Sequence, residues 1–173
     1  MDNPEDRWLK QHIIAAADLP SFVESIRRSN VIAVSDGSGE DRIGSAAAAL
    51  HCTHTGQRIK ATTMVPGNLQ DQLSHRSELA GILLIVKTVS MLHTEHDLTG
   101  ASITFGPDND EARKAVMAEC HPSVKKPDYD IIYDMRNRIS SLPIKFHRRW
   151  IEGTPRQDEH GLWHDGHLDT LEH

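Results

Sequence analysis

Three acidic side chains interrupt apolar segments of this chain, where a strand or a helix would reach the edge of a core. Asp36 ends the apolar run of residues 31–35 and precedes a glycine. Glu78 lies on the apolar face of a long helical segment, and Asp108 follows the apolar run of residues 101–105. Carboxylates that converge at one place repel each other unless one of them is protonated or a cation binds between them. Oxygen ligands of this kind favour Mg²⁺ or Mn²⁺.

Each of these acids also has a structural interpretation. Asp36 before Gly-Ser is typical of a turn, and Glu78 near a helix start pairs favourably with the helix dipole. Asp108 can cap the helix that follows it. Taken alone, each residue is more often structural. Their occurrence together favours a metal site, because sites in open α/β sheets gather beyond the ends of the strands.

Apolar residues predict three consecutive strands joined by short connections. The buried run of residues 31–35 is the first, and residues 45–52 and 59–65 follow. Gly37 and Gly39 accept a positive φ, so the segment after the first strand is expected to be a turn. Three strands joined in this way indicate an antiparallel meander.

The rest of the chain predicts alternating helices and strands. Apolar residues at helical spacing predict a long helix over residues 74–92, with Ser74 as its N-cap. A strand, two helices and a last strand follow at residues 101–105, 108–118, 128–140 and 144–151. Three antiparallel strands followed by this alternation predict a mixed α/β sheet with helices on its faces.

Residues 1–29 are expected to form a helical lead-in to one domain of residues 30–173. Asp18 suits the N-cap position of a short helix, with a proline in its first turn. One apolar face of that helix consists of Phe22, Val23 and Ile26. A chain of 173 residues is long enough for one domain with a good-sized core.

The composition is that of a soluble globular protein from a reducing compartment. Hydrophobic residues make up 38% of the chain and charged residues 25%, and the longest apolar run is too short to cross a membrane. Two cysteines without a CxxC pair, and an acidic N-terminus without signal-peptide character, indicate an intracellular location in the cytoplasm or the nucleus. The net charge of −6 argues against a large nucleic-acid footprint, although local basic patches still bind phosphates.

Four motifs, in the order AVSDGS, HRSELAGI, ITFGPDNDEARKAV and WIEG…QDEH…LDTL, resemble the ribonuclease H domain. More narrowly, residues 30–170 resemble the ribonuclease H-like domain of retrotransposon reverse-transcriptase polyproteins. The resemblance implies a five-stranded mixed sheet, with three antiparallel strands first and then parallel strands, and helices on both faces. It implies cleavage of the RNA strand of an RNA–DNA hybrid with two Mg²⁺ or Mn²⁺ ions. It also implies the rest of a reverse-transcriptase polyprotein as a partner.

By the same resemblance, four acids are metal ligands and catalytic residues. Asp36 bridges both ions, and Glu78 and Asp108 complete one metal site. Asp169 is the fourth acid, with Asp165 as the second choice. Two ions held in this way activate a water and stabilise the leaving oxygen of an in-line displacement, so no nucleophilic side chain is needed.

Two features depart from the pattern of the family. A Gly-His pair often follows the last strand in the family, whereas Thr154 stands at the position of that histidine here. The chain also stops soon after Asp169, within the helix that the family places there. These departures keep open a second hypothesis, that of a catalytically inactive ribonuclease H-like module with a structural or nucleic-acid-binding role.

Other polar residues are candidates for contacts with a substrate. Ser38, Arg76 and Asn109 lie beside the proposed metal ligands in the sequence. From there they can contact the backbone of a nucleic acid or the 2′-OH groups that distinguish RNA from DNA. The last predicted strand places alternating basic residues on one face, namely Lys145, His147 and Arg149.

Overall fold

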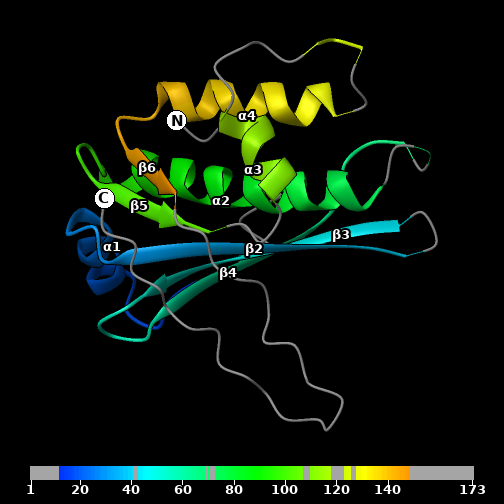
Figure 1. Cartoon of the computed structure of the whole chain (residues 1–173). Helices are drawn as coiled ribbons and strands as arrows, with labels where there is room; N and C mark the ends of the chain where they lie inside the picture. The colour runs from blue at the N-terminus through cyan, green and yellow to red at the C-terminus, as the bar shows by residue number, and fades with distance from the viewer. Residues whose placement is uncertain are drawn as a thin grey trace, which may run out of the picture.

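The computed structural model describes residues 12–40, 43–68, 70, 73–106, 110–117, 123–125 and 128–148. Its strands form one mixed sheet in the order β1-β4-β3-β2-β5-β6. The strands are β1 (Ile13–Ile14), β2 (Val31–Glu40), β3 (Ile43–Cys52), β4 (Arg58–Met64), β5 (Ser102–Phe105) and β6 (Lys145–Arg148). The helices are α1 (Leu19–Arg27), α2 (Ser74–His96), α3 (Asp110–Met117) and α4 (Tyr129–Ser141). Figure 1 shows α2 lying along the sheet, with α4 on the side of α2 away from the strands.

The directions of the strands confirm the predicted mixed α/β sheet. β2, β3 and β4 form the expected antiparallel meander, and β5 and β6 extend the sheet in parallel from β2. β1 is a sixth strand, one more than predicted, and it pairs antiparallel with β4 opposite Lys60 and Ala61. A strand of two residues is too short to produce an alternating pattern in the sequence.

α1 begins where the sequence predicts it. Asp18 is its N-cap, and the Asp18 carboxylate accepts a hydrogen bond from the Ser21 N–H at 3.1 Å. The three residues of the predicted apolar face are all buried. The Arg27 guanidinium donates to the carbonyl of His96, which ties α1 to the end of α2. The boundary at residue 30 stays a prediction, although the lead-in contributes β1 to the same sheet.

β2 is longer than predicted and contains no turn at its glycines. The strand continues from Val31 through Gly37 and Gly39 to Glu40, and it pairs with β3 along this whole length. Neither glycine has a positive φ, so the prediction that these two glycines form the turn is wrong. The chain does reverse direction within the predicted segment of residues 36–44, because β2 ends at Glu40 and its antiparallel partner β3 begins at Ile43. The strand needs glycine for a different reason, which is the close approach of α2 described below.

α2 is the central helix of the core. Leu73 is its N-cap and Ser74 its first helical residue, so the prediction of Ser74 as the N-cap is wrong by one position. The helix ends at His96, about one turn beyond the predicted end. Among the described residues it is the one helix long and apolar enough to cross a membrane by those two criteria. However, 72% of that apolar window is buried inside the fold, as in the core helix of a soluble protein.

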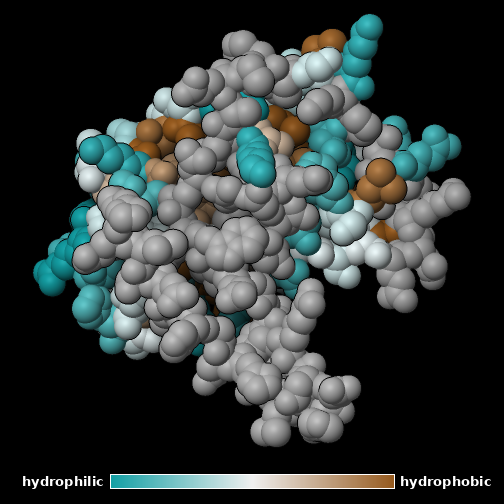
Figure 2. Space-filling model, viewed as in Figure 1, coloured by the Kyte–Doolittle hydropathy of each residue, from teal (hydrophilic) through white to brown (hydrophobic). Residues whose placement is uncertain are grey.

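The core lies on the α2 side of the sheet. Buried and more exposed residues alternate along β3, and the buried set includes Ala46, Ala48 and Leu50. On β4, Ile59 and Ala61 are buried in the same way. The opposite face of the antiparallel strands is more exposed in the described part of the chain. In Figure 2, hydrophilic side chains cover much of the coloured surface, with small hydrophobic groups between them.

Candidate active site

Asp36 lies within β2, on the face of the strand that is turned away from α2. Its partner on β3 is Ala47, and the Asp36 residue is exposed. Asp36 makes no side-chain hydrogen bond or ion pair within the described residues. Because Asp36 is in the middle of a paired strand, the turn that would explain an aspartate here is absent. The structural interpretation of this residue therefore loses its support.

The glycine after Asp36 allows α2 to approach β2 backbone to backbone. A Cβ atom at Gly37 would lie 2.4 Å from the backbone nitrogen of Glu78 and 2.4 Å from the carbonyl carbon of Ser77. α2 has a glycine of its own at this contact, since a Cβ atom at Gly81 would lie 3.4 Å from the carbonyl oxygen of Asp36. The two glycines thus hold the part of α2 that carries Glu78 directly against the part of β2 that carries Asp36.

Glu78 occupies the second turn of α2 and is half-buried. Ile82 and Ile85, which the sequence places on the same face, are each 1% exposed. Glu78 therefore stands at the border between the core and the surface, beside the strand of Asp36. The structure brings the backbones of two predicted metal ligands together at one junction of strand and helix, and their role as ligands stays a prediction.

β5 ends beside the same part of β2. Phe105 pairs with Ala33, and the Gly106 N–H donates to the Ala33 carbonyl at 3.0 Å. Asp108 follows two positions later and lies outside the described residues.

Several other predicted residues also lie outside the described part of the chain, and the structure does not test them: Asn109, Arg149, Thr154, Asp165 and Asp169. Among the residues that are described, no group of three or more His, Cys, Asp or Glu side chains is arranged to hold a metal ion. Of the four predicted ligands, that part of the chain contains only Asp36 and Glu78.

Ser38 stays a candidate for contact with a substrate. It is exposed and lies two residues after Asp36 on β2, so the two side chains share one face of the sheet. Its partner on β3 is Ser45. Lys145 and His147 of β6 are exposed and also share a face, as the alternation of that strand predicts.

Arg76 has a different environment from the predicted one. Its side chain is 2% exposed, and its guanidinium donates to the two carboxylate oxygens of Asp130 at 2.9 and 2.6 Å. It also donates to the Pro66 carbonyl at 2.7 Å and to Asp128 at 3.5 Å. Two-point pairing of this kind fixes geometry, and here it joins the start of α2 to the start of α4. This burial gives no support to contact with a substrate, and we assign Arg76 to holding the two helices together.

This pair predicts a pH-dependent contribution to stability. The hydrogen bond from Arg76 lowers the pKa of the Asp130 carboxyl. A carboxyl group with a lower pKa in the folded chain stabilises the fold above its unfolded pKa, and that stability is lost as the pH falls through the folded pKa. The Asp130 side chain is 62% exposed, so solvent screens part of the interaction. We expect Asp130→Asn to lower the free energy of unfolding by about 1–2 kcal/mol at neutral pH.

Urea unfolding at neutral pH and in acid measures this effect. The difference between Asp130→Asn and the parent should begin to shrink as the pH falls below about 4, where the carboxyl group of the unfolded chain becomes protonated, and it should vanish below the lower pKa of the folded chain. Glu24→Gln is the control, because Glu24 pairs only with exposed arginines on α1 in the described structure. Its effect should stay below about 0.5 kcal/mol. If Asp130→Asn is as stable as the parent at neutral pH, the ion pair with Asp130 does not contribute to stability. The other partners of Arg76 would then be enough to fix its side chain.

No family model matches the chain, and no curated protein matches its sequence. Solved structures do match its fold. An RNase H1 isolated from compost by a metagenomic approach aligns with a TM-score of 0.51 and 12% identity, over 72% of this chain and 86% of that one. The RNase H1 of the halophilic archaeon Halobacterium salinarum aligns with a TM-score of 0.48 and 9% identity, over 71% and 86%. The N-terminal RNase H domain of a Mycobacterium tuberculosis protein aligns with a TM-score of 0.46 and 15% identity, over 71% and 82%.

The match to the compost enzyme shows that the chain has a ribonuclease H-like fold. The predicted resemblance to the ribonuclease H domain is thereby confirmed at the level of the fold. At 12% identity the match carries no residue roles from one protein to the other. The narrower placement within a retrotransposon polyprotein receives no support from the comparisons and stays a prediction.

Proposed function

We propose that the chain is a metal-dependent endonuclease that hydrolyses the RNA strand of RNA–DNA hybrids. One observation carries the proposal, namely the contact of Gly37 with Ser77 and Glu78 within a ribonuclease H-like fold. At this contact the backbone of the half-buried Glu78 of α2 packs against the residue that follows the exposed Asp36 on β2. A catalytic module needs acids at such a junction, and the turn that would have explained Asp36 structurally is absent from the described strand.

The residues at this junction suit a hard divalent cation. Asp36 offers a carboxylate that is exposed and has no hydrogen-bond or ion-pair partner in the described part of the chain. The backbone of Glu78 packs against Gly37, the next residue of the strand. Glu78, Asp108 and Asp169, or Asp165, would complete a set of oxygen ligands for Mg²⁺ or Mn²⁺. Two such ions, when bound, would supply an activated water and stabilise the leaving oxygen of the cleaved phosphodiester. The packing of β2 on α2 would hold the backbones of Asp36 and Glu78 at fixed positions.

The remaining features of the proposal concern the substrate and the setting. Ser38 lies on the face of Asp36 and would contact the sugar–phosphate backbone or a 2′-OH group, as would Asn109. Lys145 and His147 would contact phosphates farther along the hybrid. We propose an intracellular location, and a larger reverse-transcriptase polyprotein as the setting, on the resemblance of the sequence motifs alone.

Divalent metal should stabilise the fold if the acids converge. Bound cations relieve the repulsion between carboxylates, and any ligand that binds only the folded chain raises its stability by mass action. We expect millimolar Mg²⁺ or Mn²⁺ to raise the melting temperature by roughly 2–6 °C. Calorimetry with and without metal measures the shift, and Asp36→Asn should remove most of it. Equal shifts in the parent and in Asp36→Asn would place the bound metal elsewhere.

The function itself is tested with a panel of labelled substrates. The parent chain and Asp36→Asn are purified side by side and incubated with an RNA–DNA hybrid, single-stranded RNA, duplex RNA and duplex DNA. We expect the parent to cut the RNA strand of the hybrid, only with Mg²⁺ or Mn²⁺, and to leave duplex DNA intact. Binding of the hybrid without cleavage would support the inactive module instead. Equal cleavage by parent and variant would contradict the proposal.

A further inference from the structure

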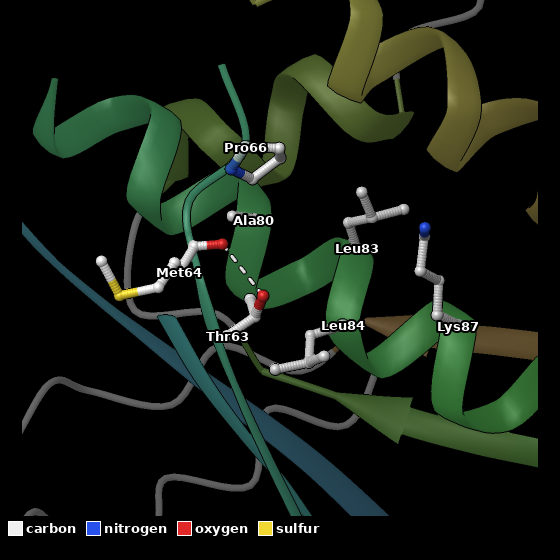
Figure 3. A pocket seen from close by; sticks show the side chains of 7 residues that line it. All are labelled: Thr63, Met64, Pro66, Ala80, Leu83, Leu84 and Lys87. Carbon is white, nitrogen blue, oxygen red and sulfur yellow. Dashed lines mark hydrogen bonds between the residues drawn. The ribbon is translucent and has the colours of Figure 1, made fainter. Parts of the chain in front are cut away.

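The antiparallel meander has an exposed face, which is turned away from α2. We call it the open face, and it consists of every second residue of β2, β3 and β4, counted from Asp36, Ala47 and Thr62. These three residues are neighbours across the three strands. Figure 3 shows the end of β4, where the Met64 side chain points away from α2 and the Thr63 side chain lies beside the helix. Met64 therefore belongs to the open face, and Thr63 does not.

Basic residues gather at one end of the open face. Arg58 and Lys60 are exposed on β4, and His51 of β3 lies opposite Arg58. Asp36 is the one acid among the described side chains of this face. The whole chain has a net charge of −6, so a surface with this balance of charges is a local exception. The charge of this surface is complementary to phosphate groups.

These cations are available to a ligand. Lys60 makes no hydrogen bond or ion pair within the described residues. The Arg58 Nε donates to the His51 Nδ1 at 3.3 Å, and the two terminal nitrogens of the guanidinium have no partner in that part of the chain. His51 therefore orients the guanidinium, whose terminal nitrogens suit two-point pairing with a phosphate. Because its Nδ1 accepts, neutral His51 carries a proton on Nε2 and offers a further donor.

The register places these residues close enough to Asp36 to share one duplex with it. Across the strands, Lys60 is level with Val34, which lies two residues before Asp36 on β2. With strands about 4.8 Å apart and residues about 3.4 Å apart, the Cα atoms of Lys60 and Asp36 are about 12 Å apart. By the same geometry, the Cα atom of Arg58 is about 17 Å from that of Asp36.

The surface beside Asp36 is hollowed. Ala47 and Thr62, its neighbours across the strands, line a hollow of about 560 Å³ that continues to Ser45. Side chains as short as these allow a nucleic-acid backbone to come close to the sheet. The hydroxyl groups of Ser45 and Thr62 are able to hydrogen-bond to sugar or phosphate oxygens.

We propose that the open face binds the sugar–phosphate backbone of the RNA–DNA hybrid, with Lys60 and Arg58 on its phosphates and the hollow beneath it. The inference rests on the proposed function, because it takes the hybrid as the ligand. One strand of a duplex carries a phosphate about every 3.4 Å along its axis. Lys60 and Arg58 would therefore contact phosphates roughly three to five nucleotides from the scissile bond. Such contacts position a duplex and carry no sequence information, so we expect similar affinity for hybrids of different sequence.

The salt dependence of binding tests the inference. All variants carry Asp36→Asn and are kept in EDTA, so that the hybrid is not cut, and melting curves check that each variant is folded. Binding of a fluorescein-labelled RNA–DNA hybrid is followed by anisotropy over a range of KCl concentrations. Arg58→Gln and Lys60→Gln should each weaken binding by roughly three- to eightfold at about 0.1 M salt. Each should also reduce the slope of log K against log[salt] by about 1.

Lys114→Gln is the matched control, because it removes the same charge from another part of the molecule. Lys114 is exposed on α3, a helix that contacts α2 and α4 on the other side of the sheet (Figure 1). We expect this variant to bind the hybrid as tightly as the Asp36→Asn chain does. Equal losses in Lys60→Gln and Lys114→Gln would show that only the net charge matters, and this would overturn the inference.

The remaining outcomes separate the inference from the proposed function. Unchanged binding in Arg58→Gln and Lys60→Gln would overturn the inference, leave the open face to a partner other than nucleic acid, and not affect the proposed nuclease. Absence of any binding of the hybrid would also overturn it, whereas cleavage of the hybrid by the parent chain decides the proposed function separately.

Kinetics in the chain with an intact Asp36 test how the two cations act. Contacts that are equally strong in the ground state and in the transition state affect KM alone. We therefore expect Arg58→Gln and Lys60→Gln to raise KM for the hybrid and to leave kcat unchanged. A fall in kcat as large as the fall in kcat/KM would make these residues part of the chemical step and would contradict a positioning role.

Discussion

Gly37→Ala should unfold the chain at a markedly lower temperature and disable its proposed site. The added methyl group would lie 2.4 Å from backbone atoms of Ser77 and Glu78, and backbone atoms have no flexible end that can move aside. α2 must therefore shift away from β2. Overpacking of this kind costs about 1–3 kcal/mol and occasionally more. Because a misplacement of about 1 Å can cost a hundredfold in rate, hybrid cleavage below the melting temperature should also fall by about that factor.

Gly39→Ala is the matched control for this substitution. Gly39 lies on the same strand, faces the same way and also lacks a positive φ, but its added Cβ atom would meet nothing closer than the Ser77 Oγ at 3.7 Å. That distance is ordinary van der Waals contact. We expect Gly39→Ala to unfold close to the parent in urea and to keep its cleavage rate. Similar losses of stability and cleavage in both variants would show that alanine destabilises β2 at either position. The close contact of Gly37 with α2 would then not be the cause.

Asp36→Asn should abolish hybrid cleavage and leave the fold intact. Asparagine keeps the size of the side chain, and the Asp36 side chain makes no hydrogen bond or ion pair in the described structure that the change would break. The neutral amide, however, cannot hold two cations together. Residues that act as one catalytic unit lose most of the activity when any single member is removed, so we expect a fall of ~10³-fold or more. The metal-free melting temperature should be unchanged or higher, because one repelling charge is gone.

Two further variants make this result specific. Glu78→Gln should lose cleavage in the same way, since it removes the neighbouring carboxylate. Asp97→Asn should keep the parent rate, because Asp97 is exposed and follows the last residue of α2, about 28 Å along the helix from Glu78. Single-turnover cleavage of one hybrid with Mg²⁺ compares all three. Parent-like activity in Asp36→Asn would remove this residue from the catalytic machinery.

Much of the fold could be predicted because the sheet has one buried face. The alternation along β3 and β4 sets which residues enter the core, and it is visible in the sequence as a period of two. α2 shows its apolar residues over six turns, and the N-cap of α1 has a characteristic aspartate and proline. These signals are local, so they can be recognised in the sequence without knowledge of the tertiary structure.

The differences arise where distant contacts decide the local structure. Gly37 and Gly39 are typical of a turn in the sequence, but β2 continues through them and stays paired with β3. Glycine is needed at Gly37 because the backbone of α2 packs directly against it. A glycine inside a strand also indicates close backbone approach, and that signal competes with the turn signal. β1 exists only because β4 offers an edge to pair with, which two residues of sequence cannot reveal.

The acidic residues of the candidate site could be predicted from the sequence, whereas the role of Arg76 could not. Asp36 and Glu78 could be named because acids that interrupt apolar patterns need an explanation, and the structure places their strand and helix in contact. Arg76 could not be assigned correctly, since its partner Asp130 lies 54 positions away and on another helix. An arginine beside a predicted site is equally compatible with binding a phosphate and with pairing to a carboxylate.

Localisation of bound Mn²⁺ tests the central claim most directly, because cleavage can arise from traces of a host nuclease whereas a metal site belongs to the chain. Mn²⁺ titrated into the isotope-labelled protein broadens the NMR signals of nearby backbone amides. We expect broadening to begin at the amides of Asp36, Gly37, Glu78 and Gly106. The Asp97 signal should stay sharp, and Asp36→Asn should suppress the effect. Broadening centred on any other part of the fold, or none at millimolar Mn²⁺, would contradict a metal site at the junction of β2 and α2 and with it the proposed nuclease.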